Sequence, residues 1–132
     1  MYITKHTLKD LEFNEVLTQL QDYAVTRKGK DKIALIQPIR THDVLVKTLG
    51  KTDEYLKSYT HNNKIPGHQF NAIDKSLHLL GIENTFIEGE KLLDIRQMVE
   101  TVLLLHGFFK TFKLIYPLMY ETAQMLPLHP EI

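Results

Sequence analysis

Apolar residues recur at helical spacing along nearly the whole chain, and this periodicity is the strongest constraint on its fold. Between residues 41 and 59, one apolar stripe advances by four, three, four and three residues, as a single face of an α-helix does. This spacing predicts one continuous apolar face, and Asp53 and Glu54 lie off it, where we expect them to be solvated. The stripe consists of Leu45, Leu49, Thr52, Leu56 and Tyr59.

Capping residues and prolines divide the periodic segments into separate helices. We expect a short turn or helix over 7–11, then a helix with Asn14 as its N-cap. Thr26 is the expected cap of the next helix, which Pro38 stops because the residue before a proline disfavours helical conformation. Thr41 is the expected cap of the helix that carries the stripe described above. The predicted buried positions are Phe13, Val16, Leu17, Leu20 and Ala24 in the first helix, and Ile33, Ala34 and Ile36 in the second.

A long irregular segment, THNNKIPGHQFN at residues 60–71, follows the striped helix. It contains Asn-Asn and Pro-Gly turn formers, and a connection of about twelve residues is long for a compact domain. A short helix is expected next, with Gly81 as its C′ residue, and residues 82–87 are expected to be extended or turn. The apolar face of that short helix is Ile73, Leu77 and Leu80.

The longest predicted helix runs from Glu88 to Tyr116. Pro117 kinks or ends it, and a last helical piece over 118–126 is expected to end at Pro127. The chain is therefore predicted to be an all-α helical bundle with one long helix, and residues 1–132 to form a single helical domain. The stripe of the long helix keeps heptad-like spacing over about three repeats: Leu92, Ile95, Val99, Val102, His106 and Phe109.

The charge and composition exclude several classes of protein. Lys and Arg number 16 and Asp and Glu number 16, and this zero balance argues against a protein dedicated to coating nucleic acid. The absence of cysteine excludes disulfides, thiolate catalysis and cysteine-bound zinc. The N-terminus has no apolar stretch of signal-peptide length, and runs such as Val102–Leu105 are too short to cross a bilayer. We therefore expect a cytoplasmic protein that does not bind membranes.

The most charged run, TRKGKDK at residues 26–32, places a glycine beside a lysine. A phosphate-binding P-loop needs a second glycine five residues earlier and a hydroxyl after the lysine, but Ala24 and Asp31 occupy those positions. A milder alternative is contact with a nucleic-acid backbone through Arg27, Lys28 and Lys30 at a helix N-terminus. The competing interpretation is a solvated first helical turn, which the residues alone favour.

No other constellation in the sequence indicates catalysis or metal binding. The seven histidines show no pair three or four residues apart, so the spacing of a helical zinc site is missing. The carboxylate pairs Asp53-Glu54 and Glu88 with Glu90 are better explained by solvation and by a helix N-terminus. No serine lies in a nucleophile elbow. We therefore predict no catalytic residue, no bound cofactor and no metal in this chain, and do not expect it to be an enzyme.

The order of several short motifs resembles a known family. The chain carries T-L-K-D-L-E-F-x-x-V-L-x-x-L from Thr7 to Leu20 and A-x-T-x-x-G-K from Ala24 to Lys30. T-D-E-Y-L, I-P-x-H-x-F and E-x-x-x-L-L-D-I follow at 52–56, 65–70 and 88–95. Together these resemble the N-terminal region of the second, Smr-bearing class of bacterial MutS-type proteins, over essentially the whole chain. The I-P-x-H-x-F loop resembles the Bacteroidetes branch of that class.

The resemblance implies a parent protein that is a dimeric ATPase using ATP and Mg²⁺, with long helices that embrace DNA or, in some bacteria, act on ribosomes. The family's ATPase and Smr nuclease motifs are absent from this chain, so no catalytic residue transfers to any position in it. The mismatch-reading domain is also missing from this class, so mismatch recognition is not implied. The remaining expectation is a non-catalytic helical scaffold, the start of the MutS-type core, that positions lever helices relative to the ATPase.

Two other functions stay open from the sequence. One is a stand-alone helical module that binds a protein partner through an apolar face. The other is a domain that binds nucleic acid directly, for which Arg27, Lys28 and Lys30 are the candidate backbone contacts.

Overall fold

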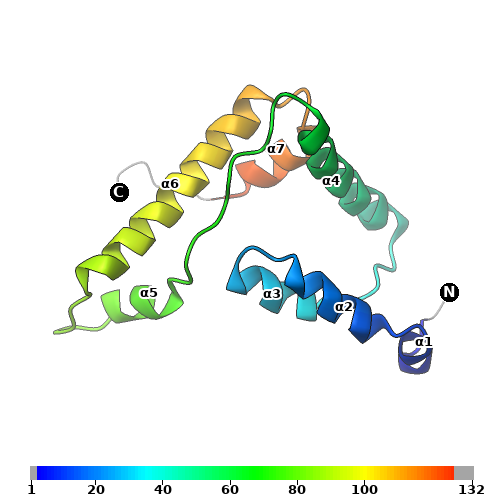
Figure 1. Cartoon of the computed structure of the whole chain (residues 1–132), viewed down its shortest axis with the longest axis horizontal. Helices are drawn as coiled ribbons and strands as arrows, with labels where there is room; N and C mark the ends of the chain where they lie inside the picture. Colours follow the sequence, from blue (N-terminus) through cyan, green and yellow to red (C-terminus); the bar gives the residue numbers. More distant parts are fainter. Residues whose placement is uncertain (1–2, 127–132) are drawn as a thin grey trace. The chain divides into compact units, whose positions relative to one another are not determined.

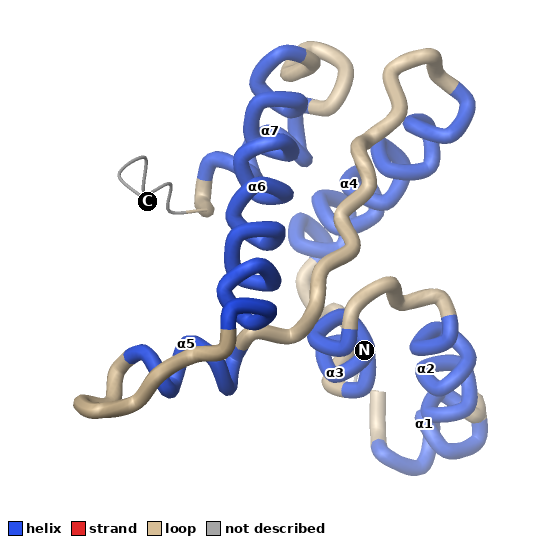
Figure 2. The backbone as a smooth tube through the Cα atoms, turned by 60° about the vertical axis from the view of Figure 1, so that its left-hand side comes forward, coloured by secondary structure: helices blue, strands red, loops and turns tan. Residues whose placement is uncertain are grey.

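The computed structural model of the chain describes residues 3–126, and every regular element in them is a helix (Figure 1). Helices and loops alternate without any strand over these residues (Figure 2), so the prediction of an all-α fold is confirmed. Within that range the helices are α1 (Lys5–Asp10), α2 (Phe13–Asp22), α3 (Arg27–Ala34), α4 (His42–Thr60), α5 (Asp74–Leu80), α6 (Gly89–Thr111) and α7 (Pro117–Gln124).

The chain forms two compact units, each built from two stretches of sequence. The first unit falls within Met1–Pro38 and Gln69–Asp94, and it holds α1, α2, α3, α5 and the first residues of α6. The second unit falls within Ile39–His68 and Ile95–Ile132, and it holds α4, α7 and the rest of α6. The single helical domain expected from the sequence stays a prediction.

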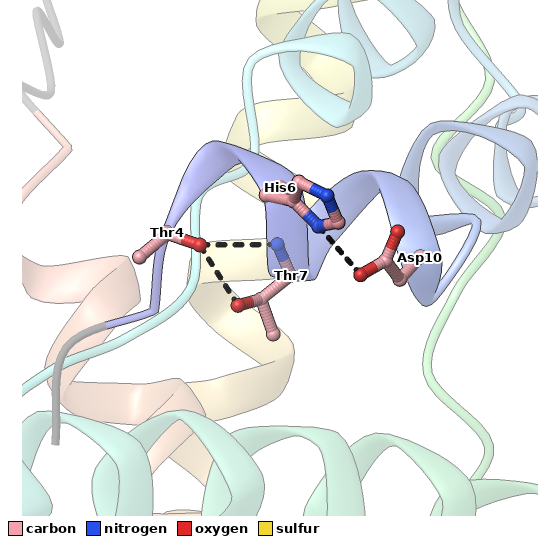
Figure 3. Close-up of polar contacts among 4 residues, drawn as sticks. All are labelled: Thr4, His6, Thr7 and Asp10. Carbon is pink, nitrogen blue, oxygen red and sulfur yellow. Dashed lines mark hydrogen bonds and ion pairs between the residues drawn. The ribbon is translucent and has the colours of Figure 1, made fainter.

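In the first unit, α1 begins with a side-chain cap. The hydroxyl of Thr4 accepts a hydrogen bond from the backbone N–H of Thr7 at 3.1 Å and lies 2.9 Å from the Thr7 hydroxyl (Figure 3). Within the same helix, Nδ1 of His6 lies 2.6 Å from a carboxylate oxygen of Asp10, one turn further along (Figure 3). The short helix expected near residues 7–11 is therefore present, beginning slightly earlier in the chain.

Helix α2 does not begin as the sequence predicted. Its N-cap is Glu12 in left-handed conformation, with φ of 50°, and not Asn14, which lies inside the helix. The turn that joins α1 to α2 imposes this conformation, because Glu12 donates its N–H to the carbonyl of Lys9 at 3.0 Å. Leu17 is the buried residue of α2, whereas Val16 and Leu20 of the predicted face are exposed.

Three other expectations for the first unit are wrong. Ala34 and Ile36 are exposed and Ile33 is half-buried, because α3 is short and Ile36 lies beyond its end. Gly81 ends α5 with φ of −83°, so it does not adopt the left-handed conformation of a C′ glycine. Ile73 is buried immediately before α5, but Leu77 and Leu80 of the expected face are exposed.

In the second unit, the core forms around the junction of α6 and α7. Phe109, Tyr116 and Ala123 are its buried members, and Ile65 from the loop after α4 packs against them. Tyr116 is fully buried, and its hydroxyl donates to the carbonyl of Asn63 at 2.7 Å, which fastens that loop to the core. The long predicted helix ends at Thr111, not Tyr116, since a turn at residues 112–116 carries Tyr116 into the core.

Pro117 occupies the first position of α7, where its missing N–H and fixed φ cost nothing. The predicted end of the last helix at Pro127 lies outside the described residues.

The buried face of α4 is polar, contrary to expectation. Residues of the apolar stripe such as Leu49 and Leu56 are exposed, whereas Glu54 is only 7% exposed. Glu54 faces α7, where its Oε1 accepts the N–H of Leu118 at 2.9 Å and its Oε2 accepts the N–H of Met119 at 2.8 Å. The expectation that Glu54 is solvated is therefore wrong, because this carboxylate caps the N-terminus of another helix.

Candidate functional site

Thr26 caps α3, as predicted, and the TRKGKDK run is a helix start. The Thr26 side chain accepts a hydrogen bond from the N–H of Gly29 at 3.1 Å. A Cβ at Gly29 would lie 3.2 Å from that same hydroxyl oxygen, which makes a glycine suit this tight cap. The glycine therefore serves the cap, consistent with the missing features of a P-loop.

The three predicted backbone-contacting residues are all exposed on α3, but they have different surroundings. The Lys28 ammonium forms an ion pair with the carboxylate of Asp74, the first residue of α5. This hydrogen bond holds the pKa of Asp74 below its usual value. Lys28 thus links two helices of the first unit, which is a structural role that its sequence context did not indicate.

Arg27 and Lys28 line a hollow of about 600 Å³ in the first unit, and Lys30 lies outside it. The lining comes from α3, α5, the residue Ala72 and the first turn of α6. Four cationic side chains and two carboxylates contribute to it, in a chain whose total charge is balanced. The complete lining is Arg27, Lys28, Asp31, Ala72, Asp74, Lys75, Ser76 and Lys91.

A second group of polar contacts holds α6 at the edge of this hollow. Asp94 accepts a hydrogen bond from the side-chain amide of Asn71 at 2.7 Å, and the ammonium of Lys91 lies 3.4 Å away from its other oxygen. These contacts, chiefly the one from Asn71, lower the pKa of Asp94. The segment before α5 and the first turns of α6 are thereby joined through one carboxylate.

Sequence reasoning missed Lys75, Ser76 and Lys91 as members of the same hollow as Arg27. They lie more than forty residues away along the chain, so no local motif connects them with the TRKGKDK run. The only sequence signal is the position of the two lysines: Lys75 and Lys91 each lie in the first turn of a helix, where a cation is opposed by the helix dipole. Ser76 is 6% exposed, so it is held firmly in the wall of the hollow.

Neither a cluster of metal-ligating side chains nor a helix that could span a membrane is found in the described part of the chain. Across residues 3–126, no group of three or more His, Asp or Glu side chains could hold a metal ion. No helix in that range has the length and apolar character needed to cross a membrane.

Comparison with known proteins relates the chain to one named protein. It is 25% identical over 128 residues to a protein of Pelotomaculum thermopropionicum named "Endonuclease MutS2", a match that covers 97% of this chain and 16% of the relative. The chain is similar to part of endonuclease MutS2. A protein with the same name from Latilactobacillus sakei is 28% identical over 102 residues, which cover 77% of this chain and 13% of the relative.

These matches support the resemblance to the second class of MutS-type proteins that the motif order predicted. The chain spans about one sixth or less of the length of these MutS2 relatives. No family profile and no solved structure matches the chain. The Bacteroidetes-like branch stays a prediction.

Proposed function

We propose that this chain is a non-catalytic helical scaffold segment of a MutS2-like clamp ATPase that acts in DNA repair and recombination control. In this role the segment positions lever helices relative to the ATPase. The similarity to MutS2 along nearly the whole chain supports the proposal. So does the all-helical architecture, in which one helix, α6, runs for 23 residues.

The contact of Glu54 with the first turn of α7 is the observation that carries the scaffold role. A buried carboxylate that accepts two backbone N–H groups fixes both the position and the direction of the helix it caps. A second contact joins the same two helices, an ion pair from Lys47 to Glu121 at 2.6 Å. A rigid pair of helices is suited to passing a displacement from one end of a clamp to the other.

The other properties of the parent protein belong to the same proposal. ATP and Mg²⁺ would bind in the ATPase portion, outside this chain, and a nuclease domain would also lie elsewhere. The partners of residues 1–132 would be the rest of their own chain and, in a homodimeric parent, DNA or a ribosome. The expected compartment is the cytoplasm.

Deleting residues 1–132 from the longer protein that carries them tests the scaffold role. We expect the deletion to abolish the stimulation of ATP hydrolysis by DNA while a basal rate remains, because the lever helices are no longer positioned relative to the ATPase. Unchanged stimulation would reject the proposal. The reading frame beyond Ile132 supplies an independent check, since the proposal requires a downstream P-loop of the form G-x-x-x-x-G-K-[ST].

A stand-alone protein-interaction module is the second candidate, and the exposed stripe of α4 favours it. Leu45, Leu49, Leu56 and Tyr59 expose between 39% and 64% of their surface, which is unusual for a regular apolar helix face. A reading frame that stopped soon after Ile132 would favour this candidate over the scaffold.

A further inference from the structure

We propose that the hollow between α3, α5 and α6 in the first unit binds a phosphate group of a nucleic-acid strand. The inference rests on the proposed function and deepens it, because it gives one face of the scaffold a direct contact with the nucleic acid. Arg27 and Lys75 are the proposed contacts, with Ser76 as a hydroxyl donor in the wall.

The first observation is that only some of the cations in the hollow have ion-pair partners. Two of its four cations already face carboxylates, Lys28 with Asp74 and Lys91 with Asp94. Within residues 3–126, Arg27 and Lys75 line the same hollow without an ion-pair partner. Arg27 and Lys75, from different helices, therefore face one space in which Asp31 is the one lining carboxylate without an ion-pair partner among residues 3–126. The excess of positive charge is what a bound oxyanion neutralises.

The positions of these cations in their helices are the second observation. Arg27 and Lys28 begin α3, Lys75 is in the first turn of α5, and Lys91 is in the first turn of α6. A cation at a helix N-terminus is opposed by the helix dipole. Asp74 and Glu90 already interact favourably with the dipoles of α5 and α6, so the unfavourable placement of cations remains at the start of α3, whose first turn holds no acidic residue.

The chemistry of the wall fits a phosphate oxygen. The guanidinium of Arg27 presents a planar set of donors that matches two phosphate oxygens, while the Lys75 ammonium acts as a point charge. The hydroxyl of Ser76 is a further donor in a residue that is almost fully buried. A space of about 600 Å³ exceeds one phosphate group, which favours a phosphate carried on a strand.

Binding of a fluorescein-labelled DNA 20-mer to the 132-residue chain tests the proposal, with fluorescence anisotropy measured from 50 to 200 mM NaCl. The double variant Arg27→Gln/Lys75→Gln should lose about tenfold in affinity at 50 mM salt, and the slope of log K against log salt should shrink by about one, as expected for the loss of one neutralised phosphate. The matched control is Lys110→Gln/Lys113→Gln, which removes two exposed cations from the other unit. It should lose less than about twofold.

A variant of opposite sign separates binding from misfolding. Asp31 lines the hollow and repels a phosphate, so Asp31→Asn should bind the 20-mer about two- to fivefold more tightly. Damage to the fold would not improve binding. Equal losses in the two double variants, or an Asp31→Asn variant that binds no tighter than the wild type, would overturn the proposal.

Inorganic phosphate and pyrophosphate distinguish the source of the phosphate group. At constant ionic strength, millimolar pyrophosphate should compete with the 20-mer in the wild type and not in Arg27→Gln/Lys75→Gln. Binding of inorganic phosphate, followed by ³¹P line broadening, without any binding of the 20-mer would contradict the proposal. The scaffold role would survive that outcome, since its test is the stimulation of ATP hydrolysis in the longer protein.

Discussion

Glu54 of α4 caps α7 by accepting the backbone N–H of Leu118 at 2.9 Å, across 64 positions of sequence. The first N–H groups of a helix have no partner within the helix, and a carboxylate at this end also interacts favourably with the dipole. The same side chain accepts the N–H of Met119 through its second oxygen, so both of its oxygens are used. A single buried acid therefore anchors the last described helix of the second unit.

We expect Glu54→Gln to destabilise the chain strongly, although glutamine has nearly the same shape as glutamate. In Glu54→Gln, one carboxylate oxygen becomes an NH₂ group that faces a backbone N–H, so one buried donor is left unsatisfied. We expect a loss of about 1–3 kcal/mol in the free energy of unfolding, measured by urea denaturation. The neighbouring Asp53→Asn is the control, because Asp53 pairs with Lys57 on the exposed surface and should cost less than about 0.5 kcal/mol. Equal losses at the two positions would contradict the capping role.

The close approach of α4 and α7 gives a second prediction, at Gly50. A Cβ there would lie 2.5 Å from Cδ1 of Leu118, so the Leu118 side chain would have to move. Gly107→Ala, on α6 where a Cβ meets nothing within 4 Å, should gain about 0.8–1 kcal/mol from helix propensity. Gly50→Ala should gain nothing and lose up to about 2 kcal/mol through overpacking. Thermal unfolding of both variants checks this, and similar gains in both would be the contrary result.

Local signals in the sequence predicted the helices and two N-cap residues, Thr26 of α3 and Thr41 of α4, although only Thr26 caps its helix with a side-chain hydrogen bond. Thr26 and Gly29 predicted the start of α3 correctly because a cap is formed by residues three positions apart. The start of α2 was predicted wrongly at Asn14, since the turn after α1 places Glu12 in left-handed conformation, which sequence alone rarely reveals for a glutamate. The end of α6 was predicted wrongly at Tyr116 because packing of that ring in the core decides where the helix ends.

Contacts between segments that are distant along the chain could not be predicted from the sequence. The apolar stripe of α4 indicated a buried face, but Gly50 and Glu54 on another side of the helix pack against α7. Which face of α4 is buried depends on the N-terminus of α7. The N–H groups there need an acceptor, which Glu54 supplies, and Gly50 allows Leu118 to approach α4 closely. In the hollow, Arg27 and Lys28 were chosen from their charge, but the roles of Lys75 and Lys91 depend on how α3, α5 and α6 are brought together.

The left-handed conformation of Glu12 predicts an unusual stabilising substitution. A non-glycine residue in this conformation costs about 1–2 kcal/mol, while glycine adds an entropic cost of about 0.5–1 kcal/mol. Glu12→Gly should therefore raise the free energy of unfolding by about 0.5–1 kcal/mol. Glu15→Gly, in the first turn of α2, should lower it by a similar amount, because glycine has low helix propensity and the acidic side chain that favours the helix dipole is lost. Chemical denaturation that ranked the two variants in the reverse order would show that Glu12 is not strained.

The ion pair of Lys28 with Asp74 predicts a dependence of stability on pH. The pKa of Asp74 is lower in the folded chain than the value of about 3.9 in an unfolded one, so the unfolded state binds more protons on acidification. The stabilisation is therefore present above about pH 4 and is lost as the pH falls through the lowered pKa. Asp74→Asn should melt below the wild type at pH 6, and this difference should close on acidification. A difference that widened below pH 4 would contradict the assignment.

The central claim, that this chain transmits movement as a rigid scaffold, is tested most directly by ATP hydrolysis in the longer protein. Glu54→Gln should leave the basal rate near that of the wild type and reduce the stimulation by DNA several-fold, because α7 is no longer held on α4. The control Asp53→Asn should retain full stimulation. Full stimulation in Glu54→Gln, in a protein whose urea denaturation confirms the weakened cap, would contradict the claim.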